Sequence, residues 1–267
     1  MNVSPSSTNA TRGVVPPGSM VAVVGATGGV GQLAVAALLR KGYQVRAVWR
    51  KEGRAYDSVG NERVTSVGVD TREEDGAEEA LRDADAVVCC TGTTAFPTKR
   101  WWAGGSPKDV DQVGVKNLVQ AAKKQDMKRF VLVSSAGVDR KDSFPFAVMN
   151  LCGVLDYKKA GEELLKQSGI PYTVLRPSRL TDGPYTSYDL NTLLQGVSGT
   201  RNQLKVSPKD NLRGECGRVA LSEAIAQILS LSCTVDQTFH LESVEGPGAT
   251  NEAEWERLFC DAASPAA

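Results

Sequence analysis

The residues of this chain best suited to chemistry are three glycines near its start. Gly25, Gly28 and Gly31 follow the apolar run Met20–Val24 at the spacing Gly-x-x-Gly-x-x-Gly, and an Ala- and Leu-rich stretch comes directly after them. A strand that turns at once into a helix presents unpaired N–H groups and the positive end of the helix dipole, which attract phosphate. The first glycine permits the turn, the second leaves room for a phosphate and the third lets helix and strand pack closely. We therefore expect these glycines, with Thr27 in the same turn, to bind the diphosphate of a dinucleotide.

The end of the next expected strand favours NADP(H) over NAD(H). An NAD site usually places Asp or Glu there, about 20 residues beyond the glycines, to bind the ribose hydroxyl. This chain has Trp49-Arg50-Lys51 instead. A guanidinium can fork onto the 2′-phosphate of NADP(H), whereas a carboxylate would repel it. Arg50 is therefore the predicted phosphate ligand, and the alternative is that Arg50 and Lys51 are a solvated strand end.

Two further strand ends carry candidate cofactor residues. Asp70 closes the segment Val67–Asp70. It is suited either to accept a hydrogen bond from the adenine amino group or to cap the following helix, and both roles could be filled. Thr91 and Gly92 follow the fourth expected strand. A glycine there lets the backbone approach the ribose of the cofactor, with a simple turn as the alternative.

These residues need a scaffold of alternating strands and helices, and the hydropathy pattern predicts one. The expected strands are Val21–Val24, Gln44–Trp49, Val64–Val69, Ala86–Cys90, Arg129–Ser134 and Tyr172–Arg176, and the expected helices are 30–41, 74–82, 109–125 and 154–168. Such alternation requires right-handed crossovers and a parallel sheet covered on both faces. The predicted fold class is therefore α/β, a Rossmann-type doubly wound parallel sheet.

Residues 20–267 are expected to form one domain, because no linker-like change of composition divides them. The segment 180–267 is less regular. It combines a loop near 181–189, helices near 189–196, 217–231 and 251–262, and a strand at Thr238–Leu241. Since ligands of open α/β sheets bind beyond the carboxyl ends of the strands, we expect this segment to shape the substrate side.

Composition argues against several classes of function. The 267 residues hold 31 basic and 31 acidic side chains, so the totals show no basic field for nucleic acid. The longest apolar stretch, Phe146–Leu155, is interrupted by Asn150 and is too short to span a bilayer. The six cysteines lack metal-ligand spacing, which predicts no metal site and is typical of a reducing compartment. Cys89 and Cys90 are expected to be small core side chains.

Residues 1–19 differ in composition from the rest of the chain. They are rich in Ser, Thr, Pro and Asn, and they contain no acidic residue and a single Arg. Such a segment buries too little apolar surface to fold, and its bias resembles that of an organelle transit peptide or its remnant. We expect a disordered leader that is dispensable for folding and for cofactor affinity.

Taken together, these residues resemble the atypical short-chain dehydrogenase/reductases, in particular their NmrA-like, NADP-binding group. The segments that carry the resemblance are Gly25–Gly31, Val45–Arg50, Gly114–Leu118, Arg129–Ser135 and Ser168–Pro177. The stretch 180–192 is similar to a narrower, plant-type group associated with chloroplasts. The resemblance implies a Rossmann fold, NADP(H) as cofactor, Pro177 beside it and Ser134 near the nicotinamide. It also implies a chloroplast location, with the cytoplasm as the alternative.

One departure from the family pattern bears on catalysis. Family reductases pair a Tyr with a Lys four residues later on one helix, where the Lys lowers the pKa of the phenol. The pattern places the lysine at Lys158, followed by Glu162, and the tyrosine position then holds Val154. Tyr157 points about 100° around the helix from Lys158 and cannot substitute directly. Lys158 is expected to hold the nicotinamide ribose or to act as a base, and the alternative is an exposed lysine.

The other candidates for proton transfer lie elsewhere in the chain. Tyr185 and Tyr188 fall on the loop expected to cap the pocket and are either phenolic donors or lining residues. The predicted catalytic residues are thus Lys158, Ser134 and Tyr185. His240, the only histidine, falls in an expected strand remote from these motifs and is expected to be structural.

Two functions follow from this pattern. The first is an NADPH-dependent reductase or isomerase of a small, largely apolar carbonyl or enone, in which the protein orients the substrate and supplies one donor. The second is a non-catalytic NADPH-binding protein that senses redox state or helps to assemble a complex, motivated by Val154. The fold permits either, and the sequence identifies no specific substrate or protein partner.

Overall fold

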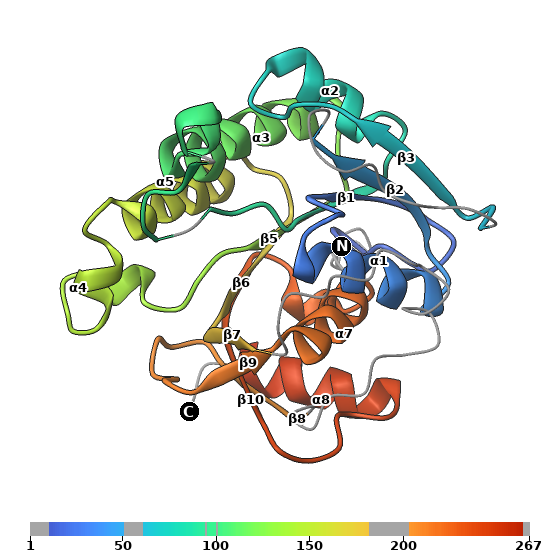
Figure 1. Cartoon of the computed structure of the whole chain (residues 1–267). Helices are drawn as coiled ribbons and strands as arrows, with labels where there is room; N and C mark the ends of the chain where they lie inside the picture. Colours follow the sequence, from blue (N-terminus) through green and yellow to red (C-terminus); the bar gives the residue numbers. More distant parts are fainter. Residues whose placement is uncertain (1–10, 51–60, 94, 100, 182–202, 264–267) are drawn as a thin grey trace, which may run out of the picture.

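The computed structural model describes residues 11–50, 61–93, 95–99, 101–181 and 203–263. Within these residues the main sheet has the strand order β3-β2-β1-β4-β5-β6-β10-β8 (Figure 1). All pairings are parallel except that of β8 with β10. The strands are β1 Met20–Val24, β2 Gln44–Trp49, β3 Val64–Gly68, β4 Ala86–Cys89, β5 Arg129–Val133, β6 Tyr172–Pro177, β8 Gln203–Ser207 and β10 Gln237–Val244. The chain crosses from β1 to both sides of the sheet, which confirms the predicted doubly wound Rossmann fold.

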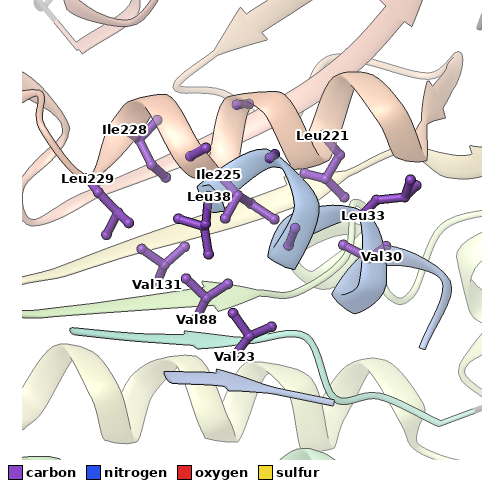
Figure 2. Close-up of a cluster of buried hydrophobic side chains, with 14 of the residues drawn as sticks. Val23, Val30, Leu33, Leu38, Val88, Val131, Leu221, Ile225, Ile228 and Leu229 are labelled. Atoms are coloured by element: carbon purple, nitrogen blue, oxygen red, sulfur yellow. The ribbon is translucent and has the colours of Figure 1, made fainter. Parts of the chain in front are cut away.

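Helices cover both faces of this sheet (Figure 1). The covering helices are α1 Gly29–Arg40, α2 Glu74–Leu81, α3 Val115–Lys124, α5 Val154–Gln167, α7 Arg218–Ile228 and α8 Glu252–Ala263, whereas the short α4 Phe146–Met149 lies away from the sheet and buries none of its residues. Side chains alternate along each strand, so Val21 and Val23 of β1 pack with α1, α7 and α8, whereas Ala22 and Val24 pack with α2, α3 and α5. Figure 2 shows the first of these cores, between the strands and the helices α1 and α7. Burial on both faces explains why the central strands β1 and β4 are apolar throughout.

The C-terminal part adds elements that the sequence did not predict. A small parallel pair, β7 Arg179–Thr181 and β9 Glu215–Gly217, lies beyond β6, and β8 forms an antiparallel edge. The expected helix 109–125 is π-helical over Lys108–Gly114 and α-helical only from Val115. The expected loop near 181–189 and helix near 189–196 fall almost wholly outside the described residues.

The segment from Arg12 to Val15 packs on the domain, which differs from the expected disordered leader. Val15 is fully buried, and its N–H donates to the carbonyl of Leu229 at 2.8 Å. The hydroxyl of Tyr43 donates to the carbonyl of Val15 at 2.8 Å, and Nη1 of the buried Arg129 donates to the carbonyl of Gly13 at 3.0 Å. The leader prediction therefore fails for residues 11–19, and residues 1–10 lie outside the description. Hydrogen bonds to Tyr43, Arg129 and Leu229 hold this segment on the domain despite its polar composition.

Two cysteines form a disulfide, which a reducing compartment does not favour. Cys233, just after α7, is bonded to Cys260 of α8. The two residues are 27 positions apart, and their spacing gave no sign of the pairing. Cys89 is a buried core residue, as expected, and Cys90 packs partly against the core. None of the described helices is long and apolar enough to cross a bilayer.

Candidate functional site

The glycine turn has the geometry that a phosphate site requires. Gly25 adopts a φ of +84°, which favours glycine. A Cβ on Gly31 would lie 2.1 Å from the carbonyl oxygen of Gly25, so this position must lack a side chain for α1 to pack on β1. A Cβ on Gly28 would meet only that oxygen, at 3.2 Å, and Gly28 is exposed, with the half-buried Thr27 beside it. Because α1 has no side-chain cap and no acidic residue in its first turn, its first N–H groups remain available to an anion.

Two charged residues occupy the ends of β2 and β3. Arg50 is exposed directly after β2. The carboxylate of Asp70 accepts hydrogen bonds from Nε of Arg72 at 2.8 and 2.9 Å and from its backbone N–H at 3.0 Å. The hydrogen bond from the Arg72 side chain is the main cause of the lowered pKa of Asp70, with a smaller contribution from the charge of Arg50. Asp70 does not cap α2, because Glu73 holds the cap position. The alternative of a capping role is therefore wrong.

Lys158 of α5 meets the buried carboxylate of Asp111, which lies in the π-helical segment Lys108–Gly114. Its Nζ donates to Oδ1 of Asp111 at 2.7 Å, and the Asp111 side chain is only 3% exposed. A Cβ on Gly92 would lie 3.3 Å from the same Nζ, so Lys158 faces the turn that follows β4. The neighbouring hydroxyl of Thr91 lies 3.2 Å from Sγ of Cys89. Lys158 is thus partly buried and paired, unlike the exposed lysine of the alternative interpretation.

Asp111 itself was missed in the sequence. Burial raises its pKa, while the charge and hydrogen bond of Lys158 oppose that shift. Its Oδ2 is buried and has no hydrogen-bond partner within the described residues. The pair is fixed by Gly161, where a Cβ would lie 2.5 Å from the carbonyl oxygen of Asp111 and would push α5 away. An acidic residue in a polar-looking helical segment gives no sequence signal of such burial.

Ser134, at the end of β5, belongs to a buried polar network rather than to an open pocket wall. Its hydroxyl donates to Oε1 of Glu162 at 2.6 Å. Arg176 of β6 binds the same carboxylate through Nε at 2.9 Å and Nη2 at 2.6 Å, and both side chains are almost fully buried. Burial alone would lower the pKa of Arg176, but its bonds to Glu162 and Asp139 outweigh burial and raise it. Glu162 therefore holds Ser134 and Arg176 in fixed positions.

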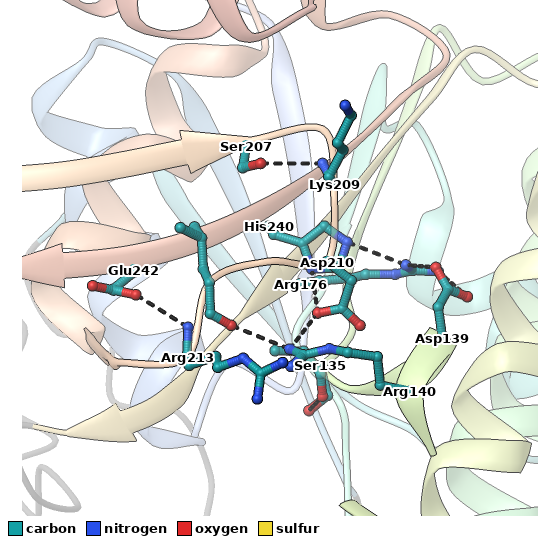
Figure 3. Close-up of polar contacts among 12 residues, drawn as sticks. Ser135, Asp139, Arg140, Arg176, Ser207, Lys209, Asp210, Arg213, His240 and Glu242 are labelled. Carbon is teal, nitrogen blue, oxygen red and sulfur yellow. Dashed lines mark hydrogen bonds and ion pairs between the residues drawn. The ribbon is translucent and has the colours of Figure 1, made fainter. Parts of the chain in front are cut away.

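His240 also joins this network, which corrects the expectation that it is remote. In β10 it pairs with Arg176 of β6, and its Nε2 lies 3.3 Å from Nη1 of that arginine. On its other side Nδ1 lies 3.3 Å from Oδ1 of Asp210, which accepts a hydrogen bond from Nη2 of Arg140 at 2.6 Å (Figure 3). Burial lowers the pKa of His240, opposed by the charge of Asp210. His240 is buried and structural in its contacts, yet Arg176 and Glu162 link it to Ser134.

The tyrosine position of the family pattern is filled by apolar packing. Val154 is the first residue of α5, is 4% exposed and packs in a cluster with Val138 and Leu155. Tyr185 and Tyr188 lie outside the described residues. Pro177 is buried at the carboxyl end of β6, and its carbonyl accepts a hydrogen bond from the N–H of Ala136 at 2.9 Å.

These positions share one edge of the molecule because they follow the carboxyl ends of parallel strands. The predicted residues at that edge are Gly25, Thr27, Gly28, Arg50, Asp70, Thr91, Gly92, Ser134 and Pro177, with Gly31 and Lys158 supplied by the adjoining helices. The arrangement offers a phosphate-binding turn, a cationic strand end and a paired lysine along one edge. Such a site can hold a dinucleotide and present a hydrogen-bond donor to a second molecule.

Comparison with known proteins agrees with this geometry. Residues 25–210 match the family model described as NAD(P)H-binding. The chain is 34% identical over 195 residues to the chloroplastic protein TIC 62 of Arabidopsis thaliana, covering 66% of this chain but only 30% of that protein. It is 28% identical over 187 residues to sanguinarine reductase of Eschscholzia californica, covering 68% and 63% of the two chains. A solved structure described as a putative NAD-dependent epimerase/dehydratase from Bacillus halodurans superposes with a TM-score of 0.67 at 26% identity, covering 86% and 96%.

Proposed function

Because the chain belongs to the NAD(P)H-binding family, we propose that it is an NADP(H)-dependent reductase or isomerase of a small, largely apolar carbonyl or enone compound. The observation that carries this proposal is the lysine at the carboxyl edge. Nζ of Lys158 is held 2.7 Å from a buried carboxylate and faces Gly92, on the same edge as the glycine turn. Similarity to a plant reductase supports the same reaction class.

The roles of the residues follow from their contacts. A bound dinucleotide supplies the hydride. Gly28 and the first turn of α1 bind its diphosphate, and Lys158 donates hydrogen bonds to the nicotinamide ribose or to the substrate oxygen. Asp111 fixes the direction of that donor from within the core. Ser134 lies one strand further along, where Glu162 holds its hydroxyl. Tyr185, which lies outside the described residues, stays the predicted additional donor.

The preference for NADP(H) rests on the charges at the ends of β2 and β3. Arg50 is exposed there and can fork onto a 2′-phosphate. The carboxylate of Asp70, at the end of β3, is already paired with Arg72, so its repulsion of a phosphate is reduced. We also propose a chloroplast location, because the relative TIC 62 is named as a chloroplastic protein.

Two neighbouring lysines provide a matched test of this function. Lys158→Met removes the donor beside Gly92, whereas Lys159→Met removes a lysine that pairs with Asp139 and Glu163 away from that turn. The assay is the rate of NADPH consumption with the quinone, enal or ketone that wild type reduces. We expect Lys158→Met to lower this rate by roughly a hundredfold or more, and Lys159→Met to leave it nearly unchanged. Equal activity of wild type and Lys158→Met would contradict the proposal.

A second function is favoured by Val154. An apolar residue packed at the tyrosine position deprives the helix of its usual proton donor. The alternative is therefore a non-catalytic NADP(H)-binding protein that senses redox state or helps to assemble a complex. Tight binding of NADPH without turnover of any quinone, enal or ketone tested would support this alternative against the reductase.

A further inference from the structure

The disulfide of this chain joins two elements of the C-terminal part. Cys233 lies in the 3₁₀ turn Ser232–Thr234 that follows α7, and Cys260 lies near the end of α8. Each of the two residues is partly exposed, so the bond lies near the surface rather than in the core. The two cysteines are 27 positions apart, and β10 and most of α8 lie between them.

The other four cysteines are free thiols, and they indicate what kind of disulfide this is. Cys89 and Cys216 are fully buried, whereas Cys152 is partly exposed and still unpaired with another cysteine. Free thiols beside a single disulfide are typical of a protein of a reducing compartment, where disulfides are rare and those that form are mostly transient. An exposed disulfide is also more open to thiol exchange than a buried one. These surroundings favour a reversible bond over a permanent cross-link.

The turn that carries Cys233 is held in place without the disulfide. Thr234 is fully buried. Its hydroxyl accepts a hydrogen bond from Nη2 of the buried Arg129 at 2.5 Å, and its carbonyl accepts one from the hydroxyl of Thr173 at 2.8 Å. Because these bonds join the turn to β5 and β6, breaking the disulfide leaves Cys233 in position.

The contacts of α8 are distributed differently along the helix. At its start, Nζ of Lys41 donates to Glu252 at 2.5 Å. Further along, the ring of Phe259 is fully buried and meets the ring of Phe239 in β10 edge-on, with centroids 5.2 Å apart. Directly after Phe259, the disulfide joins Cys260 to the turn that follows α7. Opening the bond therefore acts on the last turn of α8 and leaves the contacts at its start and middle.

The end of α8 also has space beside it. The helix lies next to α7 and to the edge strand β8 (Figure 1). A groove of about 680 Å³ runs between α8 and β8, and its walls include Leu204 and Val206 of the strand and Leu258 and Ala262 of the helix. A helix end that borders such a groove can move without displacing closely packed side chains.

We propose that the Cys233–Cys260 disulfide is a reversible redox switch, which a dithiol opens in the folded protein and whose opening loosens the end of α8. One thiolate of the dithiol attacks a sulfur of the pair, so the S–S bond breaks and a mixed disulfide forms. The second thiolate then displaces the cysteine. The dithiol is oxidised to a disulfide, and Cys233 and Cys260 are reduced to two thiols that carry its two protons. The inference depends neither on a bound dinucleotide nor on catalysis.

The first part of the test counts thiols. The protein is equilibrated with mixtures of reduced and oxidised dithiothreitol, quenched with acid, unfolded and alkylated. Its mass then shows four modified cysteines with the bond closed and six with the bond open. We expect a reversible transition between the two in a protein whose near-ultraviolet circular dichroism stays that of a folded chain.

The second part measures amide hydrogen exchange in the two states. We expect the amides in the last turns of α8 to exchange roughly tenfold or more faster after reduction, because losing the cross-link makes local opening easier. The amides of β1 and β4 should be unchanged. Cys260→Ser and Cys233→Ser should each reproduce the reduced state without a reductant. Cys152→Ser, which removes a partly exposed free thiol, is the matched control and should exchange as oxidised wild type does.

Three outcomes would overturn the inference. A bond that stays closed until the chain unfolds would be a permanent cross-link. Unchanged exchange in α8 after reduction would show that the bond does not hold the helix end. Faster exchange throughout the domain would show that the bond supports the whole fold rather than α8. Reduced wild type needs no substitution, so all three outcomes can be distinguished even if a serine variant fails to fold.

Discussion

At the scale of single residues, the ion pairs that Asp139 forms near the carboxyl edge depend on pH. Burial acts to raise the pKa of Asp139, but hydrogen bonds from Arg176 and Lys159 outweigh it and hold that pKa well below its usual range. The side chain of Asp139 is still 45% exposed, so solvent screens these pairs. Its partner Arg176 also binds Glu162, which links the surface pair to the buried network around Ser134.

Acid should therefore destabilise the protein partly through Asp139. The folded-state pKa lies below the unfolded value of about 4, so the stability that this carboxylate contributes is complete above that pH and is lost as pH falls toward the folded-state pKa. We expect the melting temperature of wild type to fall below about pH 4 more steeply than that of Asp139→Asn. Asp142→Asn, at a nearby exposed position, is the control. Parallel curves for wild type and Asp139→Asn would contradict this assignment.

The proposed preference for NADP(H) depends on a single residue, Arg50. The 2′-phosphate adds up to about two negative charges, and a guanidinium contact to it is worth roughly 1.5–3 kcal/mol. We expect Arg50→Ala to weaken NADPH by roughly tenfold to a hundredfold and to leave NADH nearly unchanged, as measured by titration at one salt concentration. An equal loss for the two dinucleotides would show that Arg50 supports only the fold or the adenine.

At the scale of elements, the N-terminal segment is tied to the domain by buried groups. Arg129 is fully buried and also binds Thr173 and Thr234, and burial lowers its pKa to about 10. Burial likewise raises the pKa of Tyr43 to about 12. Both side chains use carbonyl groups of Gly13 and Val15, which would have to be replaced by water if the segment were removed.

Deleting residues 1–15 should therefore destabilise the fold. Leaving buried polar groups unpaired costs about 1–3 kcal/mol each, which corresponds to a drop in melting temperature on the order of 5–10 °C for a chain of this size. Deleting only residues 1–10 keeps the contacts of Gly13 and Val15, so this deletion is the control and should leave the melting temperature unchanged. Equal melting temperatures for the two deletions would show that the contacts of Gly13 and Val15 contribute little.

The sequence predicted some elements much better than others. β1 and β4 are buried on both faces and apolar along their whole length, which identified them. β2, β3, β5 and β6 followed from the alternation of apolar runs with helical patterns, and the carboxyl edge with its candidate residues follows from that topology. β7 and β9 have three residues each, and β8 alternates polar with apolar residues at a sheet edge, so their pattern is weak.

At the scale of the whole molecule, the residues missed in the sequence are those whose neighbours are set by long-range packing. Asp111 meets Lys158 because Gly161 lets two helices approach closely. His240 reaches Arg176 only because β10 returns beside β6. None of these contacts has a local signature, so motif spacing predicts the proposed cofactor residues and not the contacts that the C-terminal region adds.

The central claim is that the glycine turn binds a dinucleotide, and one substitution tests it most directly. Gly28 has a φ of −76° that valine can adopt, and a side chain there would point into the space assigned to the diphosphate. Gly31→Ala is the contrasting variant, because its Cβ would strike the carbonyl oxygen of Gly25 and should lower the melting temperature. The test is to compare the affinity for NADPH of wild type and Gly28→Val by titration, and to record a melting curve for each protein. The account predicts a folded Gly28→Val protein that no longer binds NADPH, and a folded variant that binds NADPH as wild type does would contradict it.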